Sequence, residues 1–350
     1  MIKYKYIKNL LFFFEPETAH NIAEFFLENF SKIKPIKDLF IKKYFIDKKI
    51  INQTILNTTF KNPIGLAAGF DKNATMIDAT YMLGFGYTEV GTVTIKAQKG
   101  NEKPRLFRFE KEKSLQNAMG FNNQGADKLL ENIKKIKTNI PIGISIGKNK
   151  TTKESDAVDE YIYLIDKFTN ECDYIAINIS SPNTPNLRDL QNKSFVKELF
   201  NRAIAIATKP ILLKVSADIN KTNAIELCKT AIKYGCSGII ATNTTIDYNL
   251  LDEAKDFGGI SGEVIKEKSF ELFDTIAQEF FGKTMLISVG GITDANDVYK
   301  RIKAGANLVQ IYTSLIYEGP QICKNINTEL VKLLKKDGFD CISEAVGANR

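Results

Sequence analysis

The sequence predicts an α/β fold, a (β/α)8 TIM barrel that carries a small helical hairpin at its amino terminus. Two observations lead to this prediction. From residue 62 onward, eight short apolar runs rich in β-forming residues alternate with helical stretches. Most of these runs are apolar without interruption, as expected for parallel strands covered by helices. Eight such units over roughly 250–290 residues match the size of a closed barrel. Periodicity alone leaves a doubly wound parallel sheet as the alternative.

The helical hairpin is predicted over residues 1–48, and the barrel domain over residues 49–350. The Glu15-Pro16-Glu17 sequence ends one helix and begins a second, because proline is favoured in a first turn. Either the apolar face of these two short helices packs on the main domain, or the hairpin covers a hydrophobic opening. The apolar residues that recur at helical spacing are Tyr6, Leu10, Phe13, Phe14, Ala19, Ile22, Ala23, Phe26 and Phe30.

The elements of the barrel domain follow in order. A short β-ribbon is predicted over residues 50–60, with a turn at Asn57. The eight strands are predicted at Pro63–Gly69, Tyr87–Thr92, Ile140–Ile146, Tyr174–Ile179, Ile211–Val215, Gly238–Thr242, Met285–Val289 and Leu308–Tyr312. Helical stretches between them include Ala157–Phe168, Phe195–Thr208, Ala224–Tyr234 and Ala295–Ala304.

Charge and composition narrow the range of partners. The net charge is +7, and residues 1–61 hold eleven lysines, no arginine and six acids, a local balance of +5. A basic segment rich in apolar residues favours an anionic lipid surface, with nucleic acid as the competing partner. No apolar stretch is long enough for a transmembrane helix. The Met1–Phe14 segment lacks a small-residue cleavage site, so we do not predict a signal peptide.

Cysteine and histidine usage limits the possible chemistry. The five cysteines form no CxxC pair, and their odd number gives no closed disulfide framework, which indicates a reduced, cytoplasmic setting. The only histidine is His20, so the sequence predicts no metal site and no histidine-based triad. Proton transfer is therefore expected to depend on another residue type.

Polar residues are concentrated at the ends of the predicted strands, where barrel enzymes carry their chemistry. Amides and hydroxyls at this density suit a flat ligand that forms many hydrogen bonds. These strand-end segments are 67–72, 91–94, 147–150, 178–184, Lys214, 242–245, 290–292 and 312–314.

Three of these segments suggest specific roles. Gly290-Gly291, which follows the seventh strand, favours a phosphate of a cofactor, although a plain turn is the alternative. Lys214 either turns outward or places its charge beside an electron-rich ring. Ser181 has no histidine to activate it, because His20 is expected to lie far away in the hairpin. A structural role for this serine and a role as a proton acceptor are equally open.

Two longer motifs carry a family resemblance. Residues 117–123 read Asn-Ala-Met-Gly-Phe-Asn-Asn, and residues 178–184 read Asn-Ile-Ser-Ser-Pro-Asn-Thr. Together with the start at residues 15–20, they resemble the class 2 dihydroorotate dehydrogenases, which are membrane-associated and quinone-linked. The resemblance extends to the Tyr312-Thr313 strand end. It implies FMN as the cofactor, oxidation of (S)-dihydroorotate to orotate in de novo pyrimidine biosynthesis, and transfer of the electrons to a membrane quinone.

The resemblance also implies roles for individual residues. Ser181 matches the catalytic base, where the soluble class 1 enzymes use cysteine. The positions that match substrate-binding residues are Lys72, Asn117, Ala118, Met119, Gly120, Phe121, Asn178, Asn183, Asn243 and Thr244. The positions that match the FMN site are Ala68, Gly69, Phe70, Asp71, Lys72, Thr92, Ser145, Asn178, Lys214, Thr242, Gly262, Gly291, Tyr312 and Thr313.

Three positions depart from the family pattern. Ala118 stands where many relatives carry arginine, and Ser145 where an asparagine often meets the flavin. Thr313 replaces a common serine and keeps the hydroxyl. The first two departures bear on local contacts and affinity, and the reaction itself is expected to be unchanged.

The implied mechanism has Ser181 removing a proton from C5 of dihydroorotate while hydride leaves C6 for FMN. We expect a monomer, bound peripherally to the cytoplasmic side of the cell membrane, that does not bind nucleic acid. A flavin barrel that reduces RNA uridines is one alternative, but it would need a cysteine in a strand-end loop. Others are a soluble dihydroorotate dehydrogenase coupled to fumarate or NAD, and a non-catalytic binding barrel.

Overall fold

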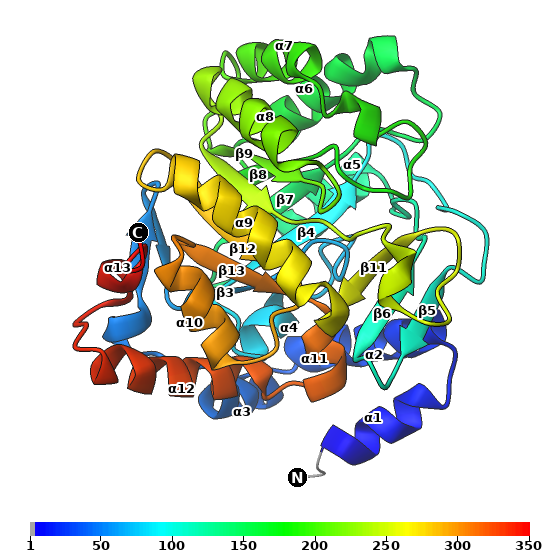
Figure 1. The fold of residues 1–350 in the computed structure, drawn as a ribbon. Coiled ribbons are helices and arrows are strands. Elements are labelled where there is room, and N and C mark those ends of the chain that lie inside the picture. Colours follow the sequence, from blue (N-terminus) through cyan, green and yellow to red (C-terminus); the bar gives the residue numbers. More distant parts are fainter. Residues whose placement is uncertain (1–3) are drawn as a thin grey trace.

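The computed structural model describes residues 4–350, so residues 1–3 of the predicted hairpin, and the start of the Met1–Phe14 segment, lie outside the described residues. Its centre is a closed, all-parallel barrel of eight strands (Figure 1). The ring closes because β13 pairs with β3, with Val309 opposite Ile64. This closure confirms the (β/α)8 barrel and excludes the doubly wound sheet. The strands are β3 (Ile64–Leu66), β4 (Tyr87–Val93), β7 (Ile142–Ile146), β8 (Tyr174–Asn178), β9 (Ile211–Val215), β10 (Gly238–Ala241), β12 (Met285–Val289) and β13 (Leu308–Ile311).

The observed strands match the eight predicted runs closely. The strands β9 and β12 have the predicted bounds, whereas β3 is shorter than the predicted Pro63–Gly69. The difference arises because residues 67–69 leave the strand to line the cavity described below. The predicted ribbon is present as β1 (Gln53–Ile55) and β2 (Thr58–Phe60), and Asn57 at its turn has a φ of 61°.

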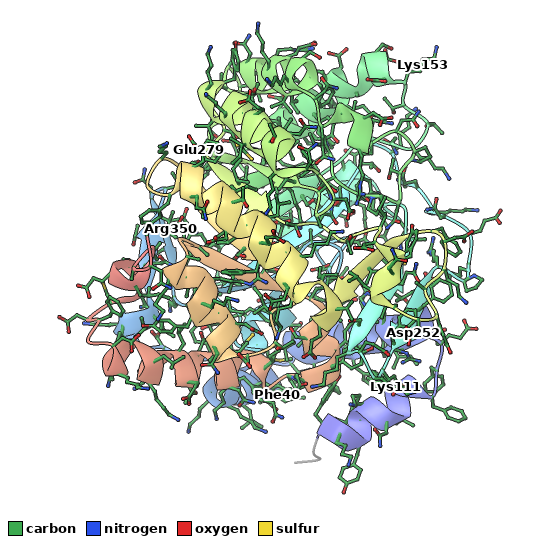
Figure 2. The ribbon with its side chains drawn as sticks, viewed as in Figure 1. Phe40, Lys111, Lys153, Asp252, Glu279 and Arg350 are labelled. Carbon is green, nitrogen blue, oxygen red and sulfur yellow. The ribbon has the colours of Figure 1, made fainter. Side chains whose placement is uncertain are left out.

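Helices surround the barrel (Figure 2). Side chains fill its interior. Inside the ring, Tyr87 and Tyr174 fill space that glycines on the neighbouring strands leave free: a Cβ on Gly65 would lie 2.2 Å from the Tyr87 ring. Phe60 of the ribbon packs edge-on against Tyr87, with ring centroids 5.3 Å apart, and closes one end of the barrel. The helices are α4 (Ile77–Met82), α5 (Ala126–Lys134), α6 (Ala157–Phe168), α7 (Lys193–Ala203), α8 (Lys221–Lys233), α9 (Lys266–Phe280), α10 (Ala295–Lys303), α11 (Thr313–Glu318), α12 (Ile322–Lys336) and α13 (Ile342–Ala345).

The amino-terminal segment differs from the predicted pair of short helices. In the described residues, three α-helices precede the ribbon: α1 (Tyr4–Phe12), α2 (Pro16–Lys32) and α3 (Lys34–Tyr44). Proline lies in the first turn of both α2 and α3, so Pro35 marks a second break that the apolar spacing did not reveal. Helices α2 and α3 pack against α4 of the barrel domain, and α1 contacts α11. No helix in residues 4–350 has the length and apolar content needed to cross a bilayer.

A three-stranded antiparallel sheet, which the sequence did not predict, stands beside the barrel. It is formed by β5 (Leu106–Phe109), β6 (Ser114–Asn117) and β11 (Gly259–Gly262), with β6 in the middle. Segments about 140 residues apart in sequence are therefore side by side, with Asn117 opposite Gly259 and Ser114 opposite Gly262 (Figure 1). This sheet forms one wall of the cavity.

Candidate functional site

A cavity that opens to solvent lies at the carboxyl ends of the barrel strands, and its empty space, together with the open solvent at its mouth, is about 1430 Å³. Residues at or after the ends of seven of the eight barrel strands line it, although they lie far apart in the chain, as expected for a barrel active site; the predicted segment 147–150 after β7 does not line it. The structure brings most of the predicted site residues together on this one cavity. Those that line it are Ala68, Gly69, Lys72, Thr92, Asn117, Met119, Gly120, Phe121, Asn178, Ser181, Asn183, Lys214, Thr242, Asn243, Thr244, Gly262, Gly291, Tyr312 and Thr313.

Two of the predicted contacts lie behind the cavity wall. The Phe70 ring packs edge-on against the rings of His20 and Tyr312, with centroids 5.1 and 5.4 Å away. The Asp71 carboxylate accepts hydrogen bonds from the backbone N–H groups of Thr75 and Met76, at 2.9 and 2.8 Å, and burial raises its pKa to about 6. Both residues therefore support the loop instead of facing a ligand.

Ser145 and Ala118 also do not line the cavity. Ser145 is fully buried, and its Oγ lies 2.9 Å from Thr92 Oγ1, so it reaches the cavity only through that threonine. Ala118 instead lines a neighbouring pocket, beside Lys103 and Phe257. Ser145 and Ala118 are therefore not placed to contact a ligand in this cavity.

Asparagine side chains from three loops form the polar wall. Asn183 Nδ2 donates to Asn117 Oδ1 at 3.0 Å, and Asn183 Oδ1 is buried without a partner in the described chain. Asn178 Nδ2 donates to Thr92 Oγ1 at 2.9 Å, and Asn243 Nδ2 donates to Asn178 Oδ1 at 3.3 Å. Amides already held by protein partners can present their remaining groups to a planar ligand with little loss of entropy.

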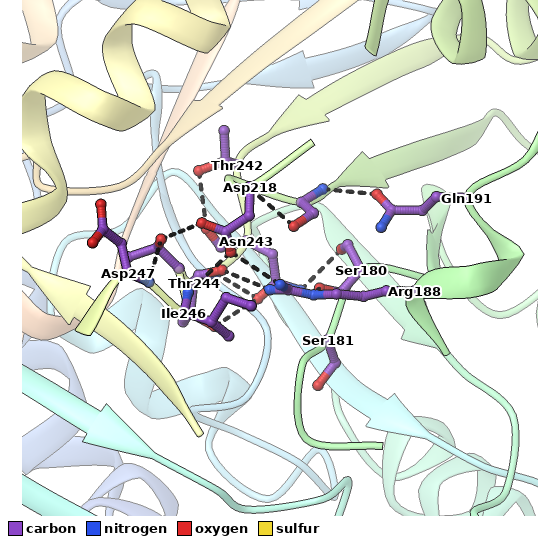
Figure 3. A network of polar contacts seen from close by, with 12 residues as sticks. Ser180, Ser181, Arg188, Gln191, Asp218, Thr242, Asn243, Thr244, Ile246 and Asp247 are labelled. Atoms are coloured by element: carbon purple, nitrogen blue, oxygen red, sulfur yellow. Dashed lines mark hydrogen bonds and ion pairs between the residues drawn. The ribbon is translucent and has the colours of Figure 1, made fainter. Parts of the chain in front are cut away.

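Ser181 lies in the loop after β8, and its side chain is almost buried. Its Oγ accepts a hydrogen bond from Asn183 N at 3.2 Å, an arrangement that leaves the hydroxyl proton free to point elsewhere. In Figure 3 the hydroxyl points away from the neighbouring network of polar contacts. Ser181 therefore has the position required of a proton acceptor that faces the cavity.

Arg188 joins the three loops that carry these groups (Figure 3). Its Nε donates to Ser180 O at 3.1 Å, its Nη2 to Thr244 O at 3.1 Å, and its Nη1 pairs with Asp218 Oδ2 at 2.9 Å. Burial would raise the pKa of Asp218, but hydrogen bonds from Thr245 and Lys268 leave it lowered, so the carboxylate stays charged. Sequence reasoning missed both residues, although an arginine seven positions after the serine was a visible signal.

The predicted Lys214 belongs to a buried charged cluster at the cavity wall, whose other members, Glu89 and Gln310, the sequence analysis missed. Lys214 Nζ lies 3.3 Å from Glu89 Oε1, and both side chains are buried. Glu89 also accepts hydrogen bonds from Gln310 Nε2 at 2.7 Å and Tyr174 Oη at 3.1 Å. A glutamate in the middle of a predicted core strand was the signal, because a buried carboxylate requires a partner. Gln310 lines the cavity, and its Oε1 has no partner in the part of the chain that the structure describes.

The prediction that His20 lies far from the site is wrong. His20 lines the cavity from α2, together with Glu17 and near Lys72. Burial, and then the charge of Lys72, lower the pKa of His20 to about 3, so the ring is neutral at physiological pH. Burial also lowers the pKa of Lys72, although the charges of Glu24 and Glu17 oppose this. An anionic ligand beside Lys72 would balance the charge of its ammonium group.

The turn at Gly290-Gly291 lines the far end of the cavity, near Gly262 and Thr313. Both glycines have positive φ, 116° and 67°, and a Cβ on Gly291 would lie 2.3 Å from the Lys266 Cα. Thr313 Oγ1 lies 2.9 Å from Ser261 Oγ, and the Ser314 hydroxyl is buried without a partner in the described residues. Backbone N–H groups and hydroxyls in this arrangement suit a phosphate.

The cysteines lie elsewhere. Cys172, Cys228, Cys236 and Cys323 are buried, and burial raises the pKa of each thiol, which makes them poor nucleophiles. None of the five cysteines lines the cavity, and residues 4–350 contain no group of three metal-ligating side chains.

Comparisons with known proteins agree with this geometry. The family model described as Dihydroorotate dehydrogenase matches residues 50–334. The chain is 54% identical to a Dihydroorotate dehydrogenase (quinone) of Nitratiruptor sp. over 98% of each chain, and 54% identical to that of Sulfurimonas denitrificans over the full length of both. Two solved DHODH structures from Eimeria tenella superpose on it. One, in complex with ferulenol, is 31% identical and covers 95% of each chain with a TM-score of 0.85. The other, ligand-free, is 30% identical and covers 96% of this chain and 99% of that chain with a TM-score of 0.87.

Proposed function

The chain belongs to the dihydroorotate dehydrogenase family, in its quinone-linked class 2, and from this premise we propose that it oxidises (S)-dihydroorotate to orotate with FMN and passes the electrons to a membrane quinone. In the cell this reaction would serve de novo pyrimidine biosynthesis. One observation carries the proposal: Ser181, the four asparagines of the polar wall, the buried Lys214 and the half-buried Lys72 come from distant parts of the chain and line a single cavity. These groups are suited to a planar, anionic substrate stacked on a second ring.

The cavity fits FMN on features of this chain alone. Gln310 Oε1 and Ser314 Oγ are buried acceptors that lack protein partners among the described residues, and both line the cavity. Ala67, Ala68 and Gly69 line the cavity, and these small residues leave room for a flat ring to lie against them. Thr92, Asn178, Lys214 and Thr242 would hold the ring, and Gly262, Gly291, Tyr312 and Thr313 the phosphate. When bound, FMN would supply the acceptor for the hydride that dihydroorotate loses at C6.

The proton-transfer step belongs to Ser181. Its Oγ would take the proton from C5 of dihydroorotate, which leaves a C5–C6 double bond as the C6 hydride departs. Asn183 N donates to that oxygen, and this hydrogen bond would lower the cost of negative charge on it. The hydroxyl proton then has to leave to a neighbour or to water.

Binding and orientation belong to the amides and to Lys72. The Lys72 ammonium would pair with the substrate carboxylate, which supplies the anion that its buried charge requires. Asn117, Asn183 and Asn243 would fix the ring so that C5 faces Ser181, which lowers the entropic part of the barrier. Lys214, held by Glu89, would place a positive charge under the ring that receives the electrons.

Residues 1–48 are proposed as the module that binds the membrane surface and gives quinone access to the cavity. Ten of the sixteen exposed large apolar side chains of the described structure lie between Tyr6 and Leu39, with Phe13 89% exposed. Glu17 and His20 of α2 line the cavity, so this segment borders both solvent and site. Exposed aromatic side chains beside lysines suit peripheral attachment to an anionic leaflet, on the cytoplasmic side of the cell membrane. We expect the protein to act there as a monomer.

The test is an anaerobic titration of the purified flavoprotein with dihydroorotate. We expect stoichiometric bleaching of the flavin absorbance, followed by reoxidation that is much faster with a short-chain quinone than with fumarate or NAD. Faster reoxidation by fumarate or NAD would assign the soluble type. Absence of bleaching, together with salt-sensitive binding of RNA, would point to an RNA-reducing flavin barrel instead.

A further inference from the structure

Arg301 is a fully buried arginine outside the residues discussed so far. It lies in the last turn of α10, and its side chain is 2% exposed. Nη1 donates to Ser288 Oγ at 2.8 Å, and Nη2 donates to Gly290 O at 2.7 Å and Ser269 Oγ at 3.0 Å. A further bond runs from Nη2 to Lys266 O at 3.2 Å. All four partners are neutral.

A buried cation usually has a carboxylate against it, because removing a charge from water is costly. Within the described chain, Arg301 makes no ion pair. Asp297 and Glu267 act on it only from a distance, and Asp297 is already bound by Lys266 at 2.9 Å. Burial accordingly lowers the pKa of Arg301 to about 10, which leaves it charged at neutral pH. The carboxyl end of α10 offsets part of this cost.

The other cations near this end of the cavity are already neutralised. Lys113 lines the cavity, but it pairs with Glu318 at 2.9 Å, and solvent reaches both side chains, which are 49% and 43% exposed. Lys266 pairs with Asp297, and Glu263 adds a further negative charge at the rim. Arg301 is therefore the cation at this end that lacks a carboxylate partner among residues 4–350.

The Gly290-Gly291 turn lies between Arg301 and the cavity. One side packs against the start of α9, where a Cβ on Gly290 would meet Ser269 Cβ at 2.7 Å and one on Gly291 would meet Lys266 Cα at 2.3 Å. The guanidinium and the Ser269 hydroxyl both bind the Gly290 carbonyl, which fixes this oxygen on the side away from the cavity. The other side of the turn lines the cavity.

We propose that Arg301 is the residue that makes the site specific for a phosphorylated flavin over the same flavin without its phosphate. It acts through the turn: its hydrogen bonds hold the Gly290 carbonyl back, and its unpaired charge attracts a phosphate dianion on the opposite face. The inference rests on the proposed use of FMN. It adds a source for the charge that balances the phosphate, since the predicted cradle itself consists of neutral backbone and hydroxyl groups.

The test compares the dissociation constants of FMN and riboflavin, measured by fluorescence quenching with flavin-free, full-length protein. In Arg301→Met, which keeps the length of the side chain, we expect the FMN dissociation constant to rise at least tenfold and that of riboflavin less than threefold. A unit charge several ångströms from a dianion, at an effective dielectric constant of about 20, accounts for a change of that size. Arg301→Lys should retain most of the preference for FMN.

Lys300→Met is the matched control. It removes the same charge from the adjacent position of α10, but on the exposed side, where Lys300 lies 3.8 Å from Glu267. We expect less than a twofold change with either flavin, because solvent screens that charge. Equal weakening of both flavins in Arg301→Met would mean that the arginine only supports the turn, and would overturn the inference.

If Arg301→Met does not fold, Arg301→Lys decides the matter. A preference for FMN that is lost although the charge is kept would contradict the charge argument, whereas a preference within threefold of wild type would support it. A wild-type protein that binds neither flavin would instead contradict the proposed function, so the two failures can be told apart.

Discussion

The two sides of the cavity differ in how far the protein satisfies its own groups. On the side of the strand-end loops, amides, hydroxyls and Arg188 are buried or half-buried and bind one another, and a few acceptors such as Asn183 Oδ1 have no partner in the described chain. On the side of α1 and α2, aromatic and aliphatic side chains face solvent, with Leu10 66% and Phe25 62% exposed. The first side is organised before a ligand arrives. The second side exposes apolar groups that no part of the described chain covers.

This difference separates two kinds of specificity. The strand-end side can select a small molecule by hydrogen bonds at fixed positions, where a misplaced group leaves a buried atom unpaired. The helical side can select only a class of surface, because apolar contact is not directional. Substitutions on the two sides should therefore affect different half-reactions.

The largest effect is expected for Ser181→Ala. Loss of the proton acceptor should slow reduction of bound flavin by dihydroorotate by roughly 10²- to 10⁴-fold, while flavin remains bound. Anaerobic stopped-flow measurement of the flavin absorbance gives the rate, with the exposed Ser194→Ala as the control. Reduction at the wild-type rate would remove Ser181 from the mechanism.

A smaller effect on the same half-reaction is expected for Arg188→Gln. The loops bearing Ser180, Asp218 and Thr244 would lose their common tie, and misplacement of the serine should slow flavin reduction by about 10- to 100-fold. Arg188→Lys should recover part of the rate, and Arg202→Gln, which removes an exposed ion pair with Asp159, should change nothing. If Arg188→Gln weakened thermal stability but left the reduction rate unchanged, the tie would be structural only.

On the helical side, the Leu10→Ser and Phe13→Ser double variant should impair only the other half-reaction. We expect roughly tenfold weaker binding to anionic vesicles and a several-fold higher KM for a long-chain quinone, because two exposed apolar side chains no longer enter the lipid. Flavin reduction by dihydroorotate should be unchanged. Tyr163→Ser, which alters an exposed side chain remote from this segment, serves as the control in the vesicle assay. Unaltered vesicle binding in the double variant would show that the helical side does not bind the membrane through these side chains.

The smallest effect concerns His20, whose ring we expect not to titrate near neutral pH. The pKa of His20 is lowered to about 3, so its ring should stay neutral between pH 5 and 8. The unfolded chain would bind a proton there below about pH 6.5. His20 should therefore contribute a loss of stability as pH decreases from about 6.5 towards 3, and His20→Gln should remove that contribution. Because the chain has one histidine, its imidazole proton resonances report the titration directly. An inflection near pH 6.5 would show that the ring is solvated.

Much of the barrel could be predicted from the sequence, because parallel strands buried on both faces leave uninterrupted apolar runs such as Ile211–Val215. The helical break before α3 and the sheet of β5, β6 and β11 could not. Pairing of β6 with β11 joins segments about 140 residues apart, and no local pattern encodes it. The positions on the cavity wall followed from the family motifs. The positions behind the wall could not be predicted in this way. Whether Ser145 contacts a ligand or only Thr92 depends on how far its side chain lies from the cavity surface, which sequence spacing does not reveal.

The four-residue strand β11 also sets a length. Its first residue, Gly259, pairs with Asn117 at the proposed substrate end of the cavity, and its last, Gly262, pairs with Ser114 at the proposed phosphate end. Three steps of extended chain, roughly 10 Å, thus act as a ruler between the two ends. A one-residue slip along this ruler would turn every side chain of the strand to the opposite face and shift both ends at once. Insertions in relatives of this protein should therefore occur in the loop at residues 110–113, between β5 and β6, and should be absent from the paired strands.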